Sequence, residues 1–319
     1  MTLVASPQPG TPGGGSGESP PALPRPGWRP KPWTERATIP RQVAATTALI
    51  LGMTLLAFTA YVMLFSRLHY DRVQYEDYAS FRAELAQAIA PTGPTQPADP
   101  KKLLTLGTPV AVLHIPEIGL NAVVLEGTSD AVLEGGPGHL RDTPLPGQAG
   151  ISEILGRRAA YGGPFARLGS LSPGEIFTVT TGQGVARYRV LDTRLAGDPV
   201  PAYSAGQGRL ILATAAGPAF VPSGVLRVDA NLISKPQPAP AMVVSPAELS
   251  PDEEALGANL LALVPLVLWG MCLVAAAVGV GWLSQRWGRW QAWIVGLPVL
   301  GYLGFAVADQ VVQLLPNLM

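Results

Sequence analysis

The side chains that most often carry covalent chemistry are scarce in this sequence. Its 319 residues include one cysteine, Cys272, and three histidines, His69, His114 and His139. A thiolate nucleophile needs a base beside it, yet Cys272 lies within a long apolar run and the histidines are far apart along the chain. A thiol in such a run usually behaves as a small apolar residue. We therefore expect no disulfide, no cysteine or histidine metal site and no cofactor.

The composition indicates a membrane protein with loop-rich or extended parts. Lys and Arg number 22, as do Asp and Glu, and only 14% of the residues are charged. This balance argues against a nucleic-acid-binding protein. The mean hydropathy of +0.26 is too high for an ordinary soluble domain, whereas 36 Gly and 33 Pro are too many for a compact helical bundle.

Three apolar segments are long enough to cross a membrane as helices. The first, 43–65, is 23 residues without a charge, enough for a hydrocarbon core of about 30 Å. The second and third are 257–283 and 292–315. The third contains Asp309, an ionisable residue that either reaches the interface or has a functional partner within the membrane.

The distribution of basic residues predicts the orientation of these helices. Five basic residues precede the first segment, and the loop 284–291 carries two arginines without acidic neighbours. Basic flanking segments remain cytoplasmic. The Pro/Gly-rich tail 1–42, which we expect to be disordered, is therefore predicted to be cytoplasmic. The region between the first two spans is predicted to be extracellular, in a protein of the cell membrane.

The extracellular region divides into a stalk, a folded domain and a linker. In 66–102, apolar residues at helical spacing predict an amphipathic stalk helix followed by a linker; they are Tyr78, Phe81, Leu85 and Ile89. Residues 235–256 form a second, Pro-rich linker. The domain between them, 103–234, is long enough for one hydrophobic core.

The pattern within 103–234 is that of strands separated by short turns. The predicted strands are 109–115, 122–126, 151–155, 175–181, 185–192, 209–215 and 225–232. A single short helix is expected near 164–168. The fold class is therefore all-β, an antiparallel barrel or sandwich.

Five blocks in this domain, taken in order, resemble the sortases, most closely the actinobacterial class E-like kind. They read GTPVAVLHIPEIGLNAVVLEGT, GGPGHLRDTPLPGQAGISEILGRR, YGGPFARLGSLSPGEIFTVTTGQGVARYRV, RLILATAAGP and VLRVDANL. The resemblance implies a barrel of about eight strands with one or two short helices. It also implies a membrane-anchored transpeptidase in which a cysteine attacks a sorting-signal peptide.

The reaction that this resemblance implies requires a thiolate, an imidazole and an arginine for the oxyanion. The family's Gly-His-Arg block reads Gly156-Arg157-Arg158 here, so Arg157 replaces the histidine. The Leu-x-Thr-Cys block ends in Ala215 in place of the cysteine, and Val225 stands where the arginine would begin the last strand. Arg227, two residues further on, lies on the same strand face and would restore an arginine after a small shift of the alignment.

These replacements predict a pseudo-sortase with no catalytic residues, which binds or scaffolds partners at the cell surface. The candidate groove or ligand-binding residues are His139, Glu153, Arg157, Arg158, Thr214 and Arg227. His139 is expected to fix its own loop by hydrogen bonds. Arg157 and Arg158 would form a cationic cleft if both lined the pocket.

Two alternatives remain open at this stage. A hydroxyl such as that of Thr214 would give a noncanonical transpeptidase or hydrolase if a base lay beside it. Alternatively, the C-terminal helices would make the protein a membrane-complex subunit, docking through the small residues of 275–281. The expected partners are the lipid bilayer and, in addition, a sorting-signal-like peptide, a cell-wall component or another membrane protein.

Overall fold

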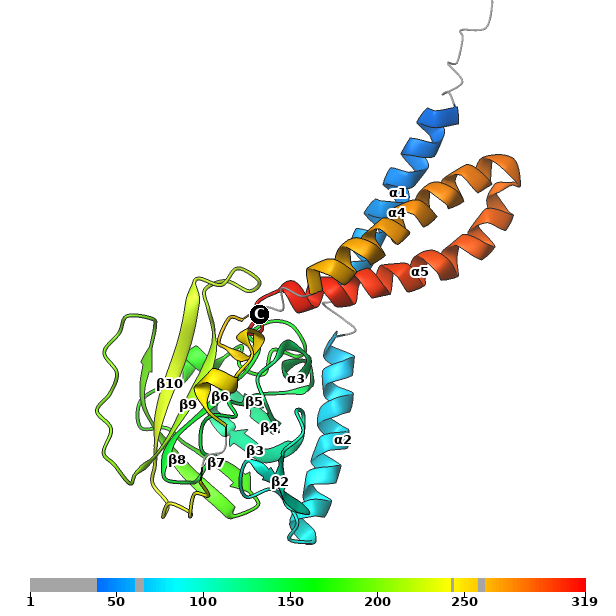
Figure 1. Ribbon diagram of the computed structural model, residues 1–319. Coiled ribbons are helices and arrows are strands. Elements are labelled where there is room, and N and C mark those ends of the chain that lie inside the picture. The colour runs from blue at the N-terminus through cyan, green and yellow to red at the C-terminus, as the bar shows by residue number, and fades with distance from the viewer. Residues whose placement is uncertain (1–38, 61–65, 242–243, 258–261) are drawn as a thin grey trace, which may run out of the picture. The chain divides into compact units, whose positions relative to one another are not determined.

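The computed structural model describes residues 39–60, 66–241, 244–257 and 262–319 (Figure 1). Most of the predicted tail, 1–38, and the end of the first apolar segment, 61–65, lie outside the described residues. The first helix, α1 (Ile39–Ala60), begins within the last residues assigned to the tail.

Eight strands form a closed barrel in the order β10-β8-β7-β3-β4-β5-β6-β9. Their bounds are β3 (Pro109–Ile115), β4 (Leu120–Glu126), β5 (Gly138–His139), β6 (Gly150–Leu155), β7 (Ile176–Thr181), β8 (Gly184–Arg194), β9 (Gly208–Ala216) and β10 (Gly224–Leu232). The barrel, the apolar N-terminal helix and the two long apolar C-terminal helices confirm the predicted fold class.

The expectation of a purely antiparallel sheet is wrong, because the barrel is mixed. Strand β4 pairs with β5 in parallel, and β6 pairs with β9 in parallel. The missed strand β5 has only two residues, too few for an alternating pattern to appear. The expected helix near 164–168 is only a 3-10 turn at Leu168–Ser170, whereas a short helix, α3 (Asp130–Gly135), follows β4.

Alternating side chains of the strands fill the barrel. In β7 every second residue is buried, and Phe177 stacks on Tyr188 of β8 at 5.6 Å between ring centroids. The two residues are direct register partners, so their rings lie on the same face of the sheet. Burying such aromatic pairs dominates core energetics.

The helix α2 (Ser66–Ala86) packs on the outside of the barrel. The Gln74 side chain donates to the carbonyls of Val123 and Gly135 and accepts from the amide of Val123. Phe81 is fully buried. Ile89, which the sequence placed on the helix, is instead exposed beyond its end. The following predicted linker contains the two-stranded sheet β1 (Thr95–Gln96) and β2 (Asp99–Leu103).

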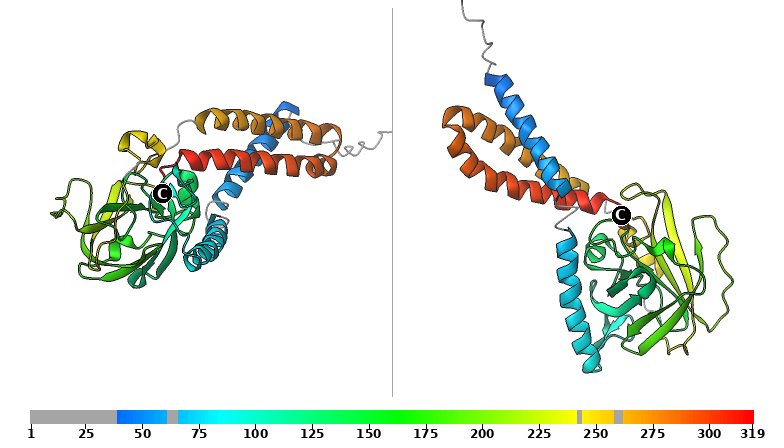
Figure 2. Two further views of the ribbon diagram at one scale, coloured as in Figure 1. Left: turned by 60° about the horizontal axis from the view of Figure 1, so that its bottom comes forward. Right: turned by 180° about the vertical axis from the view of Figure 1, so that it is seen from behind.

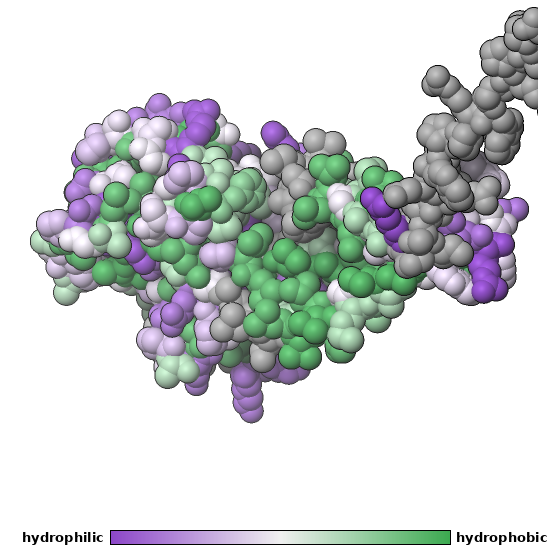
Figure 3. Space-filling view, turned by 90° about the horizontal axis from the view of Figure 1, so that it is seen from above, coloured by the Kyte–Doolittle hydropathy of each residue, from purple (hydrophilic) through white to green (hydrophobic). Residues whose placement is uncertain are grey.

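Among the described residues, two helices are long and apolar enough to cross a membrane, α4 (Leu263–Arg286) and α5 (Arg289–Leu314). The described part of α1 holds a shorter apolar stretch, Val43–Ala57. Exposed apolar side chains gather on the part of the surface that these helices form (Figure 3).

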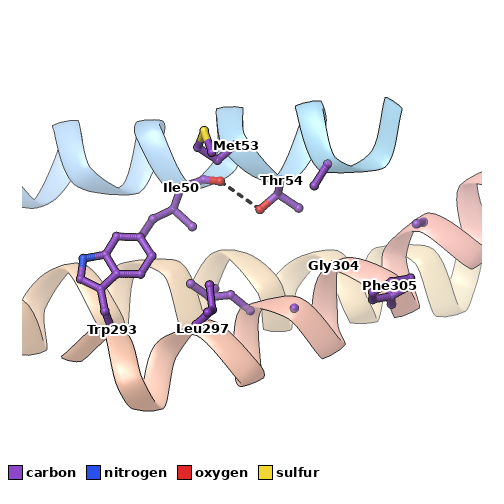
Figure 4. Close-up of a pocket in the computed structure, with 11 residues that line it drawn as sticks. Ile50, Met53, Thr54, Trp293, Leu297, Gly304 and Phe305 are labelled. Carbon is purple, nitrogen blue, oxygen red and sulfur yellow. Dashed lines mark hydrogen bonds between the residues drawn. The ribbon is translucent and has the colours of Figure 1, made fainter. Parts of the chain in front are cut away.

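Small residues allow the three apolar helices to approach closely. A Cβ atom on Gly296 of α5 would lie 2.8 Å from Val280 of α4, and Gly281 of α4 lies beside Val43 and Thr47 of α1. Of the small residues in 275–281, Ala277 and Gly281 are therefore buried within the chain, whereas Ala275 and Gly279 are exposed. Between α1 and α5 the packing is incomplete and leaves an apolar cavity of about 280 Å³ (Figure 4).

Candidate functional site

The parallel pairing of β6 and β9 brings together the positions that the sequence singled out. Parallel strands end at the same edge of a sheet, so the residues after β6 lie beside the end of β9. The amide of Gly156 donates to the carbonyl of Ala213 at 3.0 Å. Ala215 on β9 is in turn the register partner of Val225 on β10. Arg157, Ala215 and Val225 therefore occupy one edge of the barrel.

Apolar side chains cover the outer face of the barrel at this edge. Residues that alternate with the interior ones on β6, β9 and β10 form a separate buried cluster, here called the outer cluster. Its buried members are Leu133, Leu155, Ala213, Ala215, Val225 and Leu318. Leu318 comes from the segment that follows α5, so two distant parts of the chain meet at this site.

Arg157 is buried and bound to an acidic partner. Its side chain is 1% exposed, and Nη2 donates to Asp130 Oδ1 at 3.1 Å and to the Asp130 carbonyl at 3.2 Å. The guanidinium also lies over the Tyr161 ring, 5.0 Å from its centroid. The side chain therefore faces protein groups and presents no open cationic surface.

Two acids next to Arg157 hold their protons unusually tightly. Burial raises the pKa of Asp130 to about 7, an effect that the Arg157 guanidinium opposes and that Glu134 and Asp252 reinforce. Burial also raises the pKa of Glu134, although Arg157 and a hydrogen bond with Tyr161 act against the shift. The region around Arg157 is thus a buried cluster that carries less negative charge at neutral pH than its carboxyl count suggests.

Arg158 and Thr214 stabilise the edge through backbone groups. Arg158 Nη1 donates to the carbonyl of Ala215 at 3.0 Å. The hydroxyl of Thr214 is fully buried and donates to the carbonyl of Gly156 at 2.8 Å. Both side chains thus link the end of β9 to the chain after β6.

Arg227 and Glu153 lie together further along the same face. Arg227 Nε is 3.6 Å from Glu153 Oε1, an ion pair without hydrogen-bond geometry. Burial raises the pKa of Glu153, against the effect of Arg227 and Arg194. Arg227 is the register partner of Ala213, so it lies two register pairs from the pair formed by Ala215 and Val225.

His139 belongs to a different part of the barrel. Nδ1 lies 2.9 Å from Glu126 Oε2, and Nε2 lies 3.1 Å from the carbonyl of Pro144. Its register partner is Ile154 of the barrel interior, whereas Arg157 and Ala215 belong to the outer face. The geometry fits the expectation that His139 fixes its loop, and it separates this imidazole from the other candidate residues.

Part of the predicted linker 235–256 covers the site, a role that was not predicted from the sequence. Glu253 lies in the 3-10 turn Pro251–Glu253 and is 1% exposed. Its carboxylate accepts from Arg141 Nε at 2.7 Å and Nη2 at 2.5 Å. Burial would raise the pKa of Glu253, but the hydrogen bonds from Arg141 and Ser250 hold it below its usual value. The Ser250-x-x-Glu253 spacing, a capping-box pattern, was the available signal.

The segment Leu315–Met319, here called the LPNLM segment, also contributes to the site. Asn317 and Leu318 are fully buried, and Met319 is 5% exposed. No sequence pattern indicated this, because a short apolar segment after a membrane-length helix resembles the end of that helix. Within the described residues, no group of three His, Cys, Asp or Glu side chains is arranged to hold a metal ion.

Comparison with known proteins identifies the class of this barrel. Residues 113–221 match the sortase domain family. Among solved structures, sortase E from Streptomyces avermitilis is 33% identical over 41% of this chain and 91% of its own, with a TM-score of 0.36. Sortase E1 from Streptomyces coelicolor is 25% identical over 40% and 90%, with a TM-score of 0.36. A Clostridium perfringens sortase D5 transpeptidase is 19% identical over 51% and 99%, with a TM-score of 0.43.

The eight-stranded mixed barrel has the sortase fold. The chain contains a sortase family domain. No curated protein matches the chain. The matched residues include Arg157 and Ala215, whereas Val225 and Arg227 lie beyond them.

Proposed function

We propose that this protein is a membrane-anchored pseudo-sortase that binds or scaffolds partners at the outer face of the membrane. The observation that carries the proposal is the edge formed by Arg157, Ala215 and Val225. These residues replace the histidine, cysteine and arginine that the family resemblance places there. The chain's one cysteine, Cys272, lies in α4, outside the barrel.

The side chains at this edge are unsuited to acyl transfer. A guanidinium remains protonated and has no acceptor lone pair, so Arg157 is no proton shuttle. Ala215 has no nucleophilic atom. Loss of a triad nucleophile alone forfeits a factor of about a million in rate.

The neighbouring hydroxyl does not supply a substitute. A serine or threonine hydroxyl becomes a nucleophile when an adjacent base removes its proton. The Thr214 hydroxyl is a hydrogen-bond donor to the carbonyl of Gly156. His139 is the register partner of Ile154, a residue of the barrel interior. This arrangement favours the binding protein over the noncanonical transpeptidase.

The alternative of a membrane-complex subunit has less support. It requires the small residues of 275–281 to be available for other proteins; Ala277 and Gly281 are buried within this chain, whereas Ala275 and Gly279 are exposed. We assign α1, α4 and α5 an anchoring role, with the N-terminal side cytoplasmic and the barrel extracellular.

The proposal is tested by restoring the missing groups. We would compare the parent chain with an Arg157→His, Ala215→Cys variant, both carrying Cys272→Ser and purified in detergent. The probe is a sorting-signal peptide with an amine acceptor, and the readouts are a covalent peptide adduct by intact mass and the transfer product. Each protein is also made with Leu318→Ala, because Leu318 packs on Ala215 within the outer cluster.

The parent should give neither adduct nor product, and the doubly substituted chain should form the adduct. The matched control is Arg157→His with Ala213→Cys. This change moves the thiol two residues along β9 on the same face of the sheet, and the variant should remain inert. Acyl transfer by the parent would refute the hypothesis that the protein is a pseudoenzyme. Failure of Arg157→His, Ala215→Cys to form an adduct, even with Leu318→Ala, would refute a retained peptide groove.

A further inference from the structure

The LPNLM segment lies against the positions where the chemistry of a sortase would take place. The two views of Figure 2, like Figure 1, show the C-terminal end of the chain at the barrel. Asn317 and Leu318 are both 0% exposed. The segment is held by a distinct set of contacts for each of these residues.

Leu318 fills the apolar part of the site. Its side chain packs in the outer cluster with Ala215 and Val225, two of the three replaced positions. Its main-chain carbonyl accepts a hydrogen bond from the amide of Arg158 at 2.9 Å. The residue therefore lies over the nucleophile's place and is bonded to the chain directly after Arg157.

Asn317 occupies a cage of carbonyl groups. Its side-chain Nδ2 donates to the carbonyls of Thr128 at 3.0 Å, Asp252 at 2.9 Å and Glu254 at 2.9 Å. Its main-chain amide donates to the carbonyl of Gly257 at 2.9 Å. Three converging acceptors favour an N–H donor and reject a carboxylate, whose oxygens would face like partial charges.

The cage is itself fixed to the barrel. The Thr128 hydroxyl donates to the carbonyl of Glu253 at 2.6 Å, and Arg141 binds the Glu253 carboxylate. The 3-10 turn Pro251–Glu253 and the LPNLM segment thus cover the outer cluster together. A peptide that replaced the segment would have to present the same two side-chain groups and main-chain hydrogen bonds.

We propose that the LPNLM segment is an intrachain ligand of the outer cluster, and that this site binds peptides in which a side-chain amide precedes a branched aliphatic residue. The inference rests on the proposed function, because it assumes a groove retained for binding. Beyond the proposed function, it names the class of peptide that the outer cluster binds, and it states that the LPNLM segment of the same chain fills this site. An outside peptide of the same chemistry must compete with that occupant.

The first test measures whether the segment shields the site. In a Cys272→Ser background, Ala215→Cys places one thiol under Leu318, and its maleimide labelling rate is measured in the full chain. Adding Asn317→Asp, which keeps the side-chain shape but removes the donor amide, should raise the rate by about tenfold or more. Leu318→Ala should also raise it, because it removes the covering side chain.

Two control thiols separate release of the segment from loosening of the barrel. Ile211→Cys lies on the same strand but outside the outer cluster and is 8% exposed in the parent. Its labelling should not change with Asn317→Asp. Val185→Cys, at a position that is 59% exposed, should react rapidly in every background. Equal labelling of Ala215→Cys with and without both segment substitutions, or a parallel rise at Ile211→Cys, would overturn the inference.

The second test measures binding of the ligand class. The probe is a fluorescent, amidated peptide with the sequence of residues 314–319, followed by fluorescence polarisation. It should bind the Asn317→Asp chain at least about tenfold more tightly than the parent, whose own segment competes. The same peptide with Asp in place of Asn should bind neither protein. Equal affinity of the Asn and Asp peptides would overturn the assigned specificity.

These outcomes are independent of catalysis. Thiol labelling and peptide binding require no acyl transfer, so their failure would remove the intrachain ligand and leave the pseudoenzyme proposal standing. Acyl transfer by the parent would instead refute the proposed function and leave the shielding measurement unaffected.

Discussion

The buried acids beside Arg157 should make the barrel less stable as pH rises. Asp130 has its pKa raised to about 7 in the folded chain, from 3.8 in the absence of the fold. Between these two pH values, the native state therefore holds a proton on Asp130 that the unfolded state has released. Its contribution to stability is fully present below about pH 4 and is lost as pH rises through about 7. Glu134, whose pKa is also raised by burial, adds an effect of the same sign.

The size of the effect follows from proton linkage. One proton retained only by the native state lowers the free energy of unfolding by at most roughly 1.4 kcal/mol per pH unit. Glu253 has the opposite sign, because its lowered pKa contributes stability that is lost as pH falls. The decline due to Asp130 should therefore be clearest between about pH 5 and pH 7.

The measurement is urea unfolding of the full chain in detergent at several pH values. Far-UV circular dichroism in the β-sheet region follows the barrel. Tryptophan fluorescence reports on parts of the chain outside the barrel, since five of the seven tryptophans lie between residues 269 and 293 and none lies between residues 66 and 257. Asp130→Asn should flatten the pH dependence, whereas Asp198→Asn, at an exposed loop position, should leave it unchanged. A parent stability that is constant or rises over this range, or an unaltered slope in Asp130→Asn, would refute the reasoning.

Two further substitutions test the packing around the barrel and within the helices. Gln74→Ala removes two hydrogen bonds from α2 to β4 and one to α3 and should weaken the association of α2 with the barrel domain by about 1–3 kcal/mol. Hydrogen exchange in α2 should rise, whereas the exposed Gln87→Ala should not change it. Gly296→Leu would bring a Cβ to 2.8 Å from Val280 and should lower the thermal stability of the helices. Gly301→Leu, which has open space around its Cβ and lines the 280 Å³ cavity, should be tolerated; equal loss in both variants would contradict this packing.

The sequence predicted the barrel because its strands alternate. Seven strands were predicted from apolar runs between turn residues, several of them alternating, and each has a counterpart in the structure. Strand β5 escaped detection because two residues carry no period. The parallel pairing of β6 with β9 was also missed, since alternation shows which side chains are buried but not which strand is the neighbour.

The positions that the family resemblance singles out could be chosen from the sequence, but the segments that cover them could not. Arg157, Ala215 and Val225 follow from ordered motifs, and the strand pairing places them at one edge. Asp130, the partner of Arg157, lies 27 residues earlier in a short helix with no distinguishing pattern. Asn317 meets Thr128 across 189 residues. Contacts of this range depend on how the chain folds back, which no local pattern encodes.

Because Leu318 follows α5 closely, the occupancy of the barrel site is mechanically coupled to the position of a membrane-length helix. α5 has 26 residues and therefore a length of about 39 Å. A slide of one helical turn along its axis moves its end by about 5.4 Å, farther than the hydrogen bond between Leu318 and Arg158 can stretch. If the LPNLM segment occupies the site as proposed, a displacement of α5 by that distance would also displace Leu318 from the outer cluster.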